Sequence, residues 1–354
     1  MTTSKRRLTV SEIALLVVPL CALAALFVWN RFRPVPPFIY AVTNLGTLGD
    51  SHVLSLNDNG DVAGVWITKR KISRRISIPF AQQPFVWSSG AVHFLNGGDG
   101  QAEDINNLGQ VTGLSFKGDY AKAAASKQDI KLRGFFWSKG KRQNLGPLDS
   151  AQSYVMDLNN KGVVVGWSEG GDRTTRGFVW YQGKMQATHA GGVSIIPTSI
   201  NDKGDIAGGE DERDGQAVIL YANGRVQRFL KDAQALSKIN NNGALVIKRD
   251  KTAVLWQQGK EQILFVDNDD QFLRSAISNN SNDIVGNIGY GIGANDTPCL
   301  FFGNRQYDLN TLIPKNSNWV LSDVGDLNNK GQIVGHGFFN NRPSVFLLTP
   351  VPHG

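Results

Sequence analysis

The 354-residue sequence has few of the residues from which common active sites are built. It holds two cysteines, three methionines and five histidines. Cys21 lies in an apolar N-terminal run and Cys299 in an expected strand, so no disulfide is available within the body of the chain. The histidines are scattered without the spacing of metal ligands, and no stretch after residue 30 shows sustained helical periodicity. These absences argue against a metal site, a bound cofactor, a disulfide scaffold and a helical fold.

The positive charge of the chain is concentrated near its N-terminus. The formal net charge is +7, but five of the basic residues and a single acidic one lie in residues 1–33. The remaining body carries 32 basic and 29 acidic residues, which is close to neutral. Nucleic-acid binding draws on an excess of basic side chains, so we expect no nucleic-acid partner.

Residues 13–29 form an uninterrupted apolar run with basic residues on both sides. At 1.5 Å per residue the run would span about 26 Å as a helix, marginally enough for one membrane crossing. We predict an uncleaved anchor at 13–29, preceded by a basic segment at 1–12 and followed by a Pro-rich linker at 30–39. The flanking charges place the body outside the cytoplasm, anchored in a bacterial inner membrane and facing the periplasm or the exterior. The alternative is a cleaved signal peptide with residues 22–24 as its site, which would make the protein secreted.

A short turn motif recurs seven times, with copies 39 to 53 residues apart. In every copy but the sixth an aliphatic residue directly precedes Asn; in the sixth, Ser278 stands between Ile277 and Asn279. Gly follows three positions after the Asn in six of the seven copies. This pattern predicts a type I turn closed by a residue with positive φ; the sixth copy has Asn282 instead, the next-best residue for that conformation. A period of this length is typical of a repeat array. The seven turn asparagines are Asn57, Asn106, Asn159, Asn201, Asn240, Asn279 and Asn328.

Each repeat contains four strand-like segments, which we call strands A to D in chain order. In the third repeat they cover residues 152–159, 162–168, 176–181 and 184–189. The segment at 40–46 matches a strand D, whereas the last repeat has strands A, B and C but no D. The orphan strand at one end therefore fills the gap at the other, which closes a ring and removes free sheet edges. We predict an all-β, seven-bladed propeller of four-stranded antiparallel blades over residues 40–350.

The repeats resemble the HAF repeat family of extracellular bacterial proteins, whose units read I-N-x-x-G-x-V-V-G, then A-F-L-W-x-x-G, then D-L-G-T-L-G-G. The resemblance covers about residues 41–349 and departs from the family in strand C, where no repeat has His-Ala-Phe. It implies export and a repeat scaffold, and it carries over no catalytic residue. The matching segments are residues 45–49, 105–109, 158–166, 177–180 and 327–335.

Two segments imitate functional motifs. Residues 166–170 read Gly-Trp-Ser-Glu-Gly, the pattern of a serine-hydrolase elbow, but no helix is expected after Ser168, as that chemistry requires. Residues 57–61 faintly resemble a calcium loop and lack the acidic residue that completes one. The repeated turn explains the second segment in all seven copies. We therefore predict no catalytic, cofactor-binding or metal-binding residues and no enzyme.

Loop length and charge predict a binding surface on one face of the ring. The A–B and C–D turns are uniformly short, whereas the B–C loops of the first two repeats run to about 16 residues, and variable loops usually carry binding. These loops are basic, and acidic residues gather at 210–214 and 267–270. We predict a non-catalytic, membrane-tethered scaffold that docks a protein or an anionic envelope polymer here. The candidate residues are Lys69, Arg70, Lys71, Arg74, Arg75, Lys117, Lys122, Lys127, Lys131 and Arg133.

Two alternatives stay open. One is a propeller-based extracytoplasmic hydrolase or lyase acting on polysaccharide, because fold alone does not exclude an enzyme. The other is a structural spacer without a ligand. A converging carboxylate pair, or a set of His and carboxylates, at the central opening would favour the enzyme, and no such set is visible in the sequence.

Overall fold

A computed structural model describes most of the chain after residue 37. The described ranges are 38–46, 52–71, 77–117, 131–146, 150–170, 174–190, 192–210, 216–229, 233–268, 270–290, 296–303 and 305–352. The expected anchor or signal segment at 13–29 lies outside them, so that prediction stays a prediction. Within the described ranges, no helix has the length and apolar character that a membrane crossing requires.

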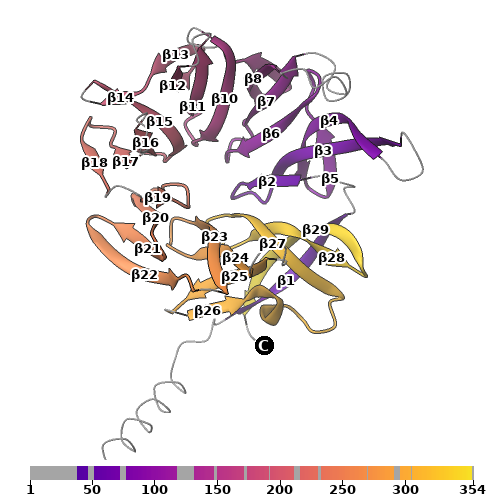
Figure 1. Ribbon diagram of the computed structural model, residues 1–354. Coiled ribbons are helices and arrows are strands. Elements are labelled where there is room, and N and C mark those ends of the chain that lie inside the picture. Colours follow the sequence, from indigo (N-terminus) through magenta and orange to yellow (C-terminus); the bar gives the residue numbers. More distant parts are fainter. Residues whose placement is uncertain are drawn as a thin grey trace, which may run out of the picture. The chain divides into compact units, whose positions relative to one another are not determined.

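Seven antiparallel sheets are arranged as blades around a central axis (Figure 1). Four strands of each blade follow one another from the axis outward, as the repeats predict, and the predicted seven-bladed propeller is confirmed. Blade 1 holds β2 (His52–Leu56), β3 (Val62–Lys71), β4 (Ser77–Ser88) and β5 (Ala91–Phe94); blade 2 holds β6 (Gly100–Ile105), β7 (Val111–Lys117), β8 (Lys131–Ser138) and β9 (Lys141–Asn144); blade 3 holds β10 (Ser150–Leu158), β11 (Val164–Gly170), β12 (Thr175–Tyr181) and β13 (Lys184–Ala187).

The remaining blades repeat this plan with small additions. Blade 4 gains a two-residue strand, β14 (His189–Ala190), and a 3-10 turn, η1 (Leu309–Leu312), connects blades 6 and 7. Blade 4 holds β15 (Val193–Ile200), β16 (Ile206–Glu210), β17 (Ala217–Leu220) and β18 (Val226–Arg228); blade 5 holds β19 (Gln234–Ala235), β20 (Ala244–Arg249), β21 (Thr252–Gln257) and β22 (Lys260–Val266); blade 6 holds β23 (Gln271–Ser278), β24 (Ile284–Tyr290), β25 (Thr297–Phe302) and β26 (Arg305–Asp308).

Blade 7 joins the two ends of the propeller. It consists of β27 (Trp319–Leu327), β28 (Ile333–Phe339), β29 (Arg342–Pro352) and β1 (Phe38–Gly46). The first strand pairs with β29 from Phe38 opposite Pro352 to Gly46 opposite Val345, and Figure 1 shows it in indigo beside the yellow final strand. Tyr40 is buried in the core of this blade. The predicted closure by the N-terminal strand is therefore confirmed.

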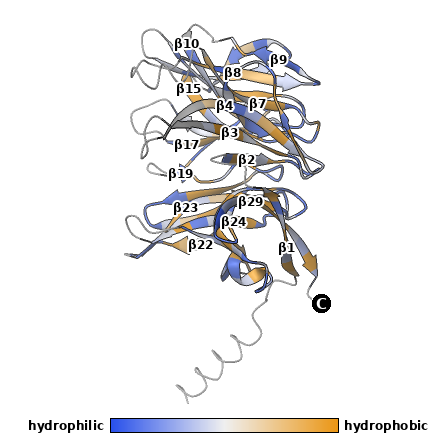
Figure 2. Cartoon of the chain, turned by 90° about the vertical axis from the view of Figure 1, so that its right-hand side faces the viewer, coloured by the Kyte–Doolittle hydropathy of each residue, from blue (hydrophilic) through white to orange (hydrophobic). Residues whose placement is uncertain are grey.

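Apolar segments lie in strands such as β8, whereas an outer strand such as β9 is largely hydrophilic (Figure 2). Strand C packs a large side chain against the second glycine of the repeat, as Phe135 does opposite Gly113. A Cβ at Gly113 would come within 2.7 Å of the Phe135 ring and would also meet the carbonyl oxygen of Gln101. Blade 5 has Ile247 at the equivalent position, and its inner strand β19 pairs there without the bulge found in its neighbours. The second glycine is thus required where the bulged inner strand approaches closely.

The turn asparagines form the predicted turn. Asn57 Oδ1 accepts hydrogen bonds from the main-chain N–H groups of Asn59 and Asp61, both at 2.9 Å. The N–H of Gly60 donates to the Asn57 carbonyl at 3.1 Å, and Gly60 has φ +87°. Asn282 takes φ +62° at the corresponding place in blade 6. The turn type inferred from the sequence is confirmed.

The same asparagines also join the blades, which the sequence did not reveal. The Nδ2 group of each donates to the carbonyl oxygen of the turn asparagine in the next blade, at 2.8 to 3.1 Å. The seventh bond, from Asn328 to Asn57, closes the circle. A second closed ring joins the following residue of each turn to its counterpart, at 2.7 to 2.9 Å. The repeat requires Asn because one side chain must accept within its own turn and donate to the next blade.

We expect Asn159→Asp to lower the free energy of unfolding by about 1–3 kcal/mol, because aspartate keeps the turn acceptor but loses the donor to the next blade. Asn159 is buried, so the new carboxylate would also face the Asn201 carbonyl without a partner. Urea unfolding measures the change. Lys161→Ala, at an exposed position of the same turn, is the matched control. Equal stability of both variants and the native chain would show that the inter-blade bond contributes nothing.

Candidate functional site

In six of the seven blades the residue two positions before the turn asparagine lines a cavity on the propeller axis, with a volume of about 160 Å³. In five blades a β-bulge in the inner strand immediately precedes this position. A bulge re-aims the side chain that follows it, which accounts for the shared orientation. We call the seven residues at this position the axial ring, of which all but Ser199 line the cavity: Ser55, Asp104, Asp157, Ser199, Lys238, Ile277 and Asp326.

The oxygen-bearing members of the axial ring are anchored to the neighbouring blade. Asp104 Oδ2 accepts the N–H of Leu158 at 2.9 Å, and Asp157 Oδ2 accepts the N–H of Ile200 at 2.7 Å. Asp326 Oδ2 accepts the N–H of Leu56 at 2.8 Å across the seam between blades 7 and 1. Each aspartate therefore uses one oxygen to join two blades, which holds the second oxygen in a fixed place.

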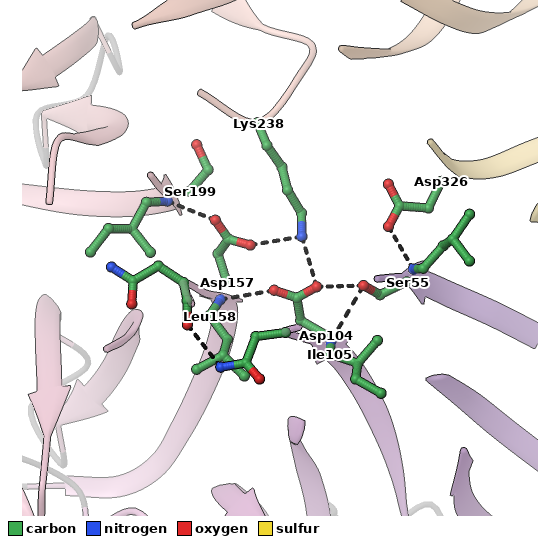
Figure 3. Close-up of polar contacts among 12 residues, drawn as sticks. Ser55, Asp104, Ile105, Asp157, Leu158, Ser199, Lys238 and Asp326 are labelled. Carbon is green, nitrogen blue, oxygen red and sulfur yellow. Dashed lines mark hydrogen bonds and ion pairs between the residues drawn. The ribbon is translucent and has the colours of Figure 1, made fainter. Parts of the chain in front are cut away.

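Lys238 reaches from blade 5 to the two aspartates of blades 2 and 3 (Figure 3). Its Nζ lies 2.9 Å from Asp104 Oδ1 and 2.7 Å from Asp157 Oδ1. The side chains of the two aspartates are 5% and 4% exposed, whereas that of Lys238 is 44% exposed. Ser55 Oγ donates to the same Asp104 oxygen at 2.5 Å. The result is a carboxylate pair bridged by one ammonium group that borders an open cavity.

The surroundings shift the pKa values of the two aspartates in opposite directions. Burial raises the pKa of Asp157 to about 7, and the nearby Asp104 adds to this effect against Lys238. Burial acts in the same direction on Asp104, but Lys238 and hydrogen bonds with Asp157 and Ser55 outweigh it, so its pKa is lowered. Desolvation opposes the charge of Lys238, yet the two aspartates hold its pKa well above the usual value. Near neutral pH the site therefore offers an ionised carboxylate, a protonatable carboxyl and an ammonium group together.

The sequence did not predict this cluster, although it indicated which feature would favour an enzyme. A converging carboxylate pair at the central opening was the feature expected of an enzyme, and Asp104 and Asp157 form one. They lie in different repeats, and Lys238 lies in a third. The shared position two residues before the turn asparagine was the available signal, because strands in equivalent places around a ring bring equivalent positions to the axis.

The predicted basic rim is mostly outside the described residues. Arg74, Arg75, Lys122 and Lys127 fall in gaps, and of Lys69, Arg70, Lys71, Lys117 and Lys131 only the backbone is described. Arg133 lies in β8 and is partly buried. The structure does not bring the ten residues together as a described surface.

The predicted length of the first B–C loop is wrong. Much of this connection forms strand, because β3 pairs with β4 as far as Lys71 opposite Ser77. The ladder between these two strands is longer than the equivalent one between β7 and β8 of blade 2. Two of the acidic residues expected to face a partner are neutralised within the propeller. Glu210 lies 2.6 Å from Arg228, and Asp267 lies 2.5 Å from Lys248.

The apparent elbow serine is part of a sheet. Ser168 is buried in β11, and the chain continues into the antiparallel strand β12. Within the described ranges, no cluster of His, Cys, Asp and Glu is arranged to hold a metal ion.

Several solved structures are similar to the propeller. They include the acylaminoacyl peptidase of Pyrococcus horikoshii, with a TM-score of 0.53 and 10% identity over 86% of this chain and 52% of that one. The β-propeller domain of the Trilobed protease from Pyrococcus furiosus, which has an open velcro topology, gives a TM-score of 0.54 and 10% identity over 85% of this chain and 97% of that one. A puromycin-hydrolyzing peptidase of Mycobacterium tuberculosis gives 0.50 and 11% over 90% and 54%. This chain thus spans about half the length of the two complete peptidases.

No family model matches the sequence. No curated protein matches it either. The HAF resemblance, the partner and the cellular location therefore stay predictions.

The comparisons correct two predictions. The expected non-catalytic scaffold and the absence of enzymatic activity are contradicted, because the similar structures are peptidases or the propeller of one, which favours the hydrolase alternative. At 10–11% identity the likeness establishes the propeller fold alone. The hydrolase has to be argued from the residues of this chain.

Proposed function

We propose that this propeller is a hydrolase that cleaves an amide bond at the axial cavity, with Asp104 as general base and Asp157 as general acid. The observation that carries the proposal is the carboxylate pair bridged by Lys238 at the central opening. Titratable groups whose environments push their pKa values apart are suited to opposite roles in proton transfer. Asp104 is held ionised and Asp157 is held protonated to about pH 7.

The proposed reaction adds water across the bond. Asp104 takes a proton from a water molecule as its oxygen attacks the carbonyl carbon, and the Lys238 ammonium stabilises the negative charge that develops. Asp157 then gives its proton to the leaving nitrogen as the C–N bond breaks, releasing a carboxylic acid and an amine. The proton acquired by Asp104 returns to Asp157 through the hydrogen bond between the two carboxyls.

The spacing of the carboxyls favours an amide over a glycoside. Glycosidases separate their two carboxyls by roughly 5 Å or more so that the sugar lies between them. Here both carboxyls contact one ammonium group and share a hydrogen bond, an arrangement that suits activation of a single water. The cavity of about 160 Å³ is smaller than the roughly 300–1,000 Å³ typical of drug-sized ligands. It would therefore take the end of a chain or a small substrate.

We expect the full chain to hydrolyse short chromogenic peptides with a bell-shaped pH dependence. Activity requires Asp104 ionised, so it falls in acid below the lowered pKa of that group. It also requires Asp157 protonated, so it falls as pH rises through about 7. The measurement is kcat/KM for p-nitroanilide peptides between about pH 3 and 9. Absence of hydrolysis throughout, or a rate that keeps rising above neutral pH, would contradict the proposal.

A further inference from the structure

Asp326 differs from the other two aspartates of the axial ring because no side-chain cation contacts it among the described residues. Its partners there are the N–H of Leu56 and its neighbour's N–H, that of Leu327, each at 2.8 Å. A carboxylate offers about four lone-pair sites, so acceptor capacity remains after these two bonds. Asp326 lines the cavity and is only partly buried.

The charge of the cavity wall is strongly one-sided. Five acidic side chains and a single ammonium group line it; four of the five remain as carboxylates when Asp157 is protonated, and the ammonium is already shared by Asp104 and Asp157. Such a cavity attracts a cation and repels an anion. Burial raises the pKa of Asp326 to about 6, the behaviour of a carboxylate whose charge is not compensated by direct contact. The five are Asp58, Asp104, Asp157, Asp202 and Asp326.

Two other acidic residues of the cavity wall, Asp58 and Asp202, are less suited to hold a ligand cation. Asp58 accepts amide N–H bonds from Asn107 at 2.7 Å and Asn329 at 2.9 Å. Asp202 is bound in the same way by Asn160 and Asn241, at 3.0 and 2.8 Å. The available charge is therefore concentrated on Asp326.

An apolar residue stands beside Asp326 in the ring. Ile277 is the only axial-ring member without a polar side chain, and it comes from blade 6, between Lys238 of blade 5 and Asp326 of blade 7. A substrate in which a positively charged group is followed by an uncharged group, and then by the bond to be cleaved, matches this order of residues. The free amino terminus of a peptide, with its first side chain, has that chemistry.

We propose that Asp326 is a specificity-determining residue that binds the protonated amino terminus of a peptide substrate, with Ile277 contacting the first residue. This inference rests on the proposed amide hydrolase and names its substrate class as peptides with an unblocked amino end.

The test compares Ala-Ala-p-nitroanilide with its N-acetylated form on the full chain. We expect kcat/KM at least about 10-fold higher for the free amine, since a charge-assisted bond is worth roughly one to two powers of ten. Asp326→Asn should reduce kcat/KM for the free amine about 10- to 100-fold, chiefly through KM, and leave the acetylated peptide within about twofold. Asn retains an acceptor for the Leu56 N–H. Asp270→Asn, at an exposed position, is the charge-matched control.

Three results overturn the inference while leaving the hydrolase intact: equal cleavage of both peptides, preference for the acetylated one, or an equal loss on both in Asp326→Asn. If neither peptide is cleaved, the hydrolase proposal fails, and calorimetric titration with Ala-Ala-amide and acetyl-Ala-Ala-amide still decides the anchor. Selective binding of the free amine supports it, and absence of binding or equal binding overturns it.

Discussion

The Asp157→Asn variant will hydrolyse peptide substrates about 10²- to 10⁴-fold more slowly than the native chain, the range that a positioned acid or base contributes. Asparagine cannot give a proton to the leaving nitrogen. It still has an oxygen to accept the Ile200 N–H that Asp157 accepts at 2.7 Å, so the link between blades 3 and 4 is retained. The measurement is kcat at the pH optimum, alongside the thermal midpoint of unfolding.

A structural role for Asp157 would give a different result. Residual activity in Asp157→Asn should lose its decline above neutral pH, because the group whose pKa is raised to about 7 is gone. Asp270→Asn serves again as the control, since it removes a carboxylate at an exposed position. Full activity in Asp157→Asn, or an unchanged pH profile, would refute its assignment as the acid.

The Lys238→Met variant will be less stable by about 2–4 kcal/mol near pH 8, because it leaves two adjacent, buried carboxyls without their cation. The native contacts of 2.9 and 2.7 Å would be replaced by a neutral side chain. The expected loss is smaller than the usual cost of breaking a fully buried pair, because Lys238 is 44% exposed and water screens its charge. Urea unfolding at two pH values measures the effect.

The loss of stability should be smaller near pH 5, and the direction of this change follows from the linkage between proton binding and folding. Asp157 already has a pKa raised to about 7, and removing Lys238 raises it further. A group whose folded pKa exceeds its unfolded value favours folding at low pH and loses that contribution as pH rises through the folded pKa. Lys203→Met, at an exposed turn position, is the control. An equal loss at both pH values would mean that packing, not charge, accounts for the instability.

The features that the sequence predicted are those set by local chemistry. The Asn-x-x-Gly turns depend on residues within five positions, and their spacing gave the number of blades. The match of residues 40–46 to a missing outer strand gave the closure that β1 and β29 make. Alternation and turn residues act over short distances, so they can be recognised in the linear sequence.

Loop length misled the prediction of the binding face. The segment that contains Lys69 to Lys71 lies in the long B–C loop that the sequence predicts, yet it pairs in β3 with the start of β4. The charge of residues 69–71 gives no sign of this pairing, which depends on the segment opposite them in the hairpin. Glu210 and Asp267 were likewise expected at a docking surface, and each pairs with a nearby basic residue.

By itself, the sequence of this protein determined a seven-fold array of turns and strands and the way its two ends meet. Only the tertiary structure decided that the turn asparagines hold one blade to the next and that Asp104, Asp157 and Lys238 meet on the axis. The physical reason is the ring itself: closure brings equivalent positions of distant repeats to one point. There burial and mutual charge, which no local pattern records, set the protonation of the carboxyls.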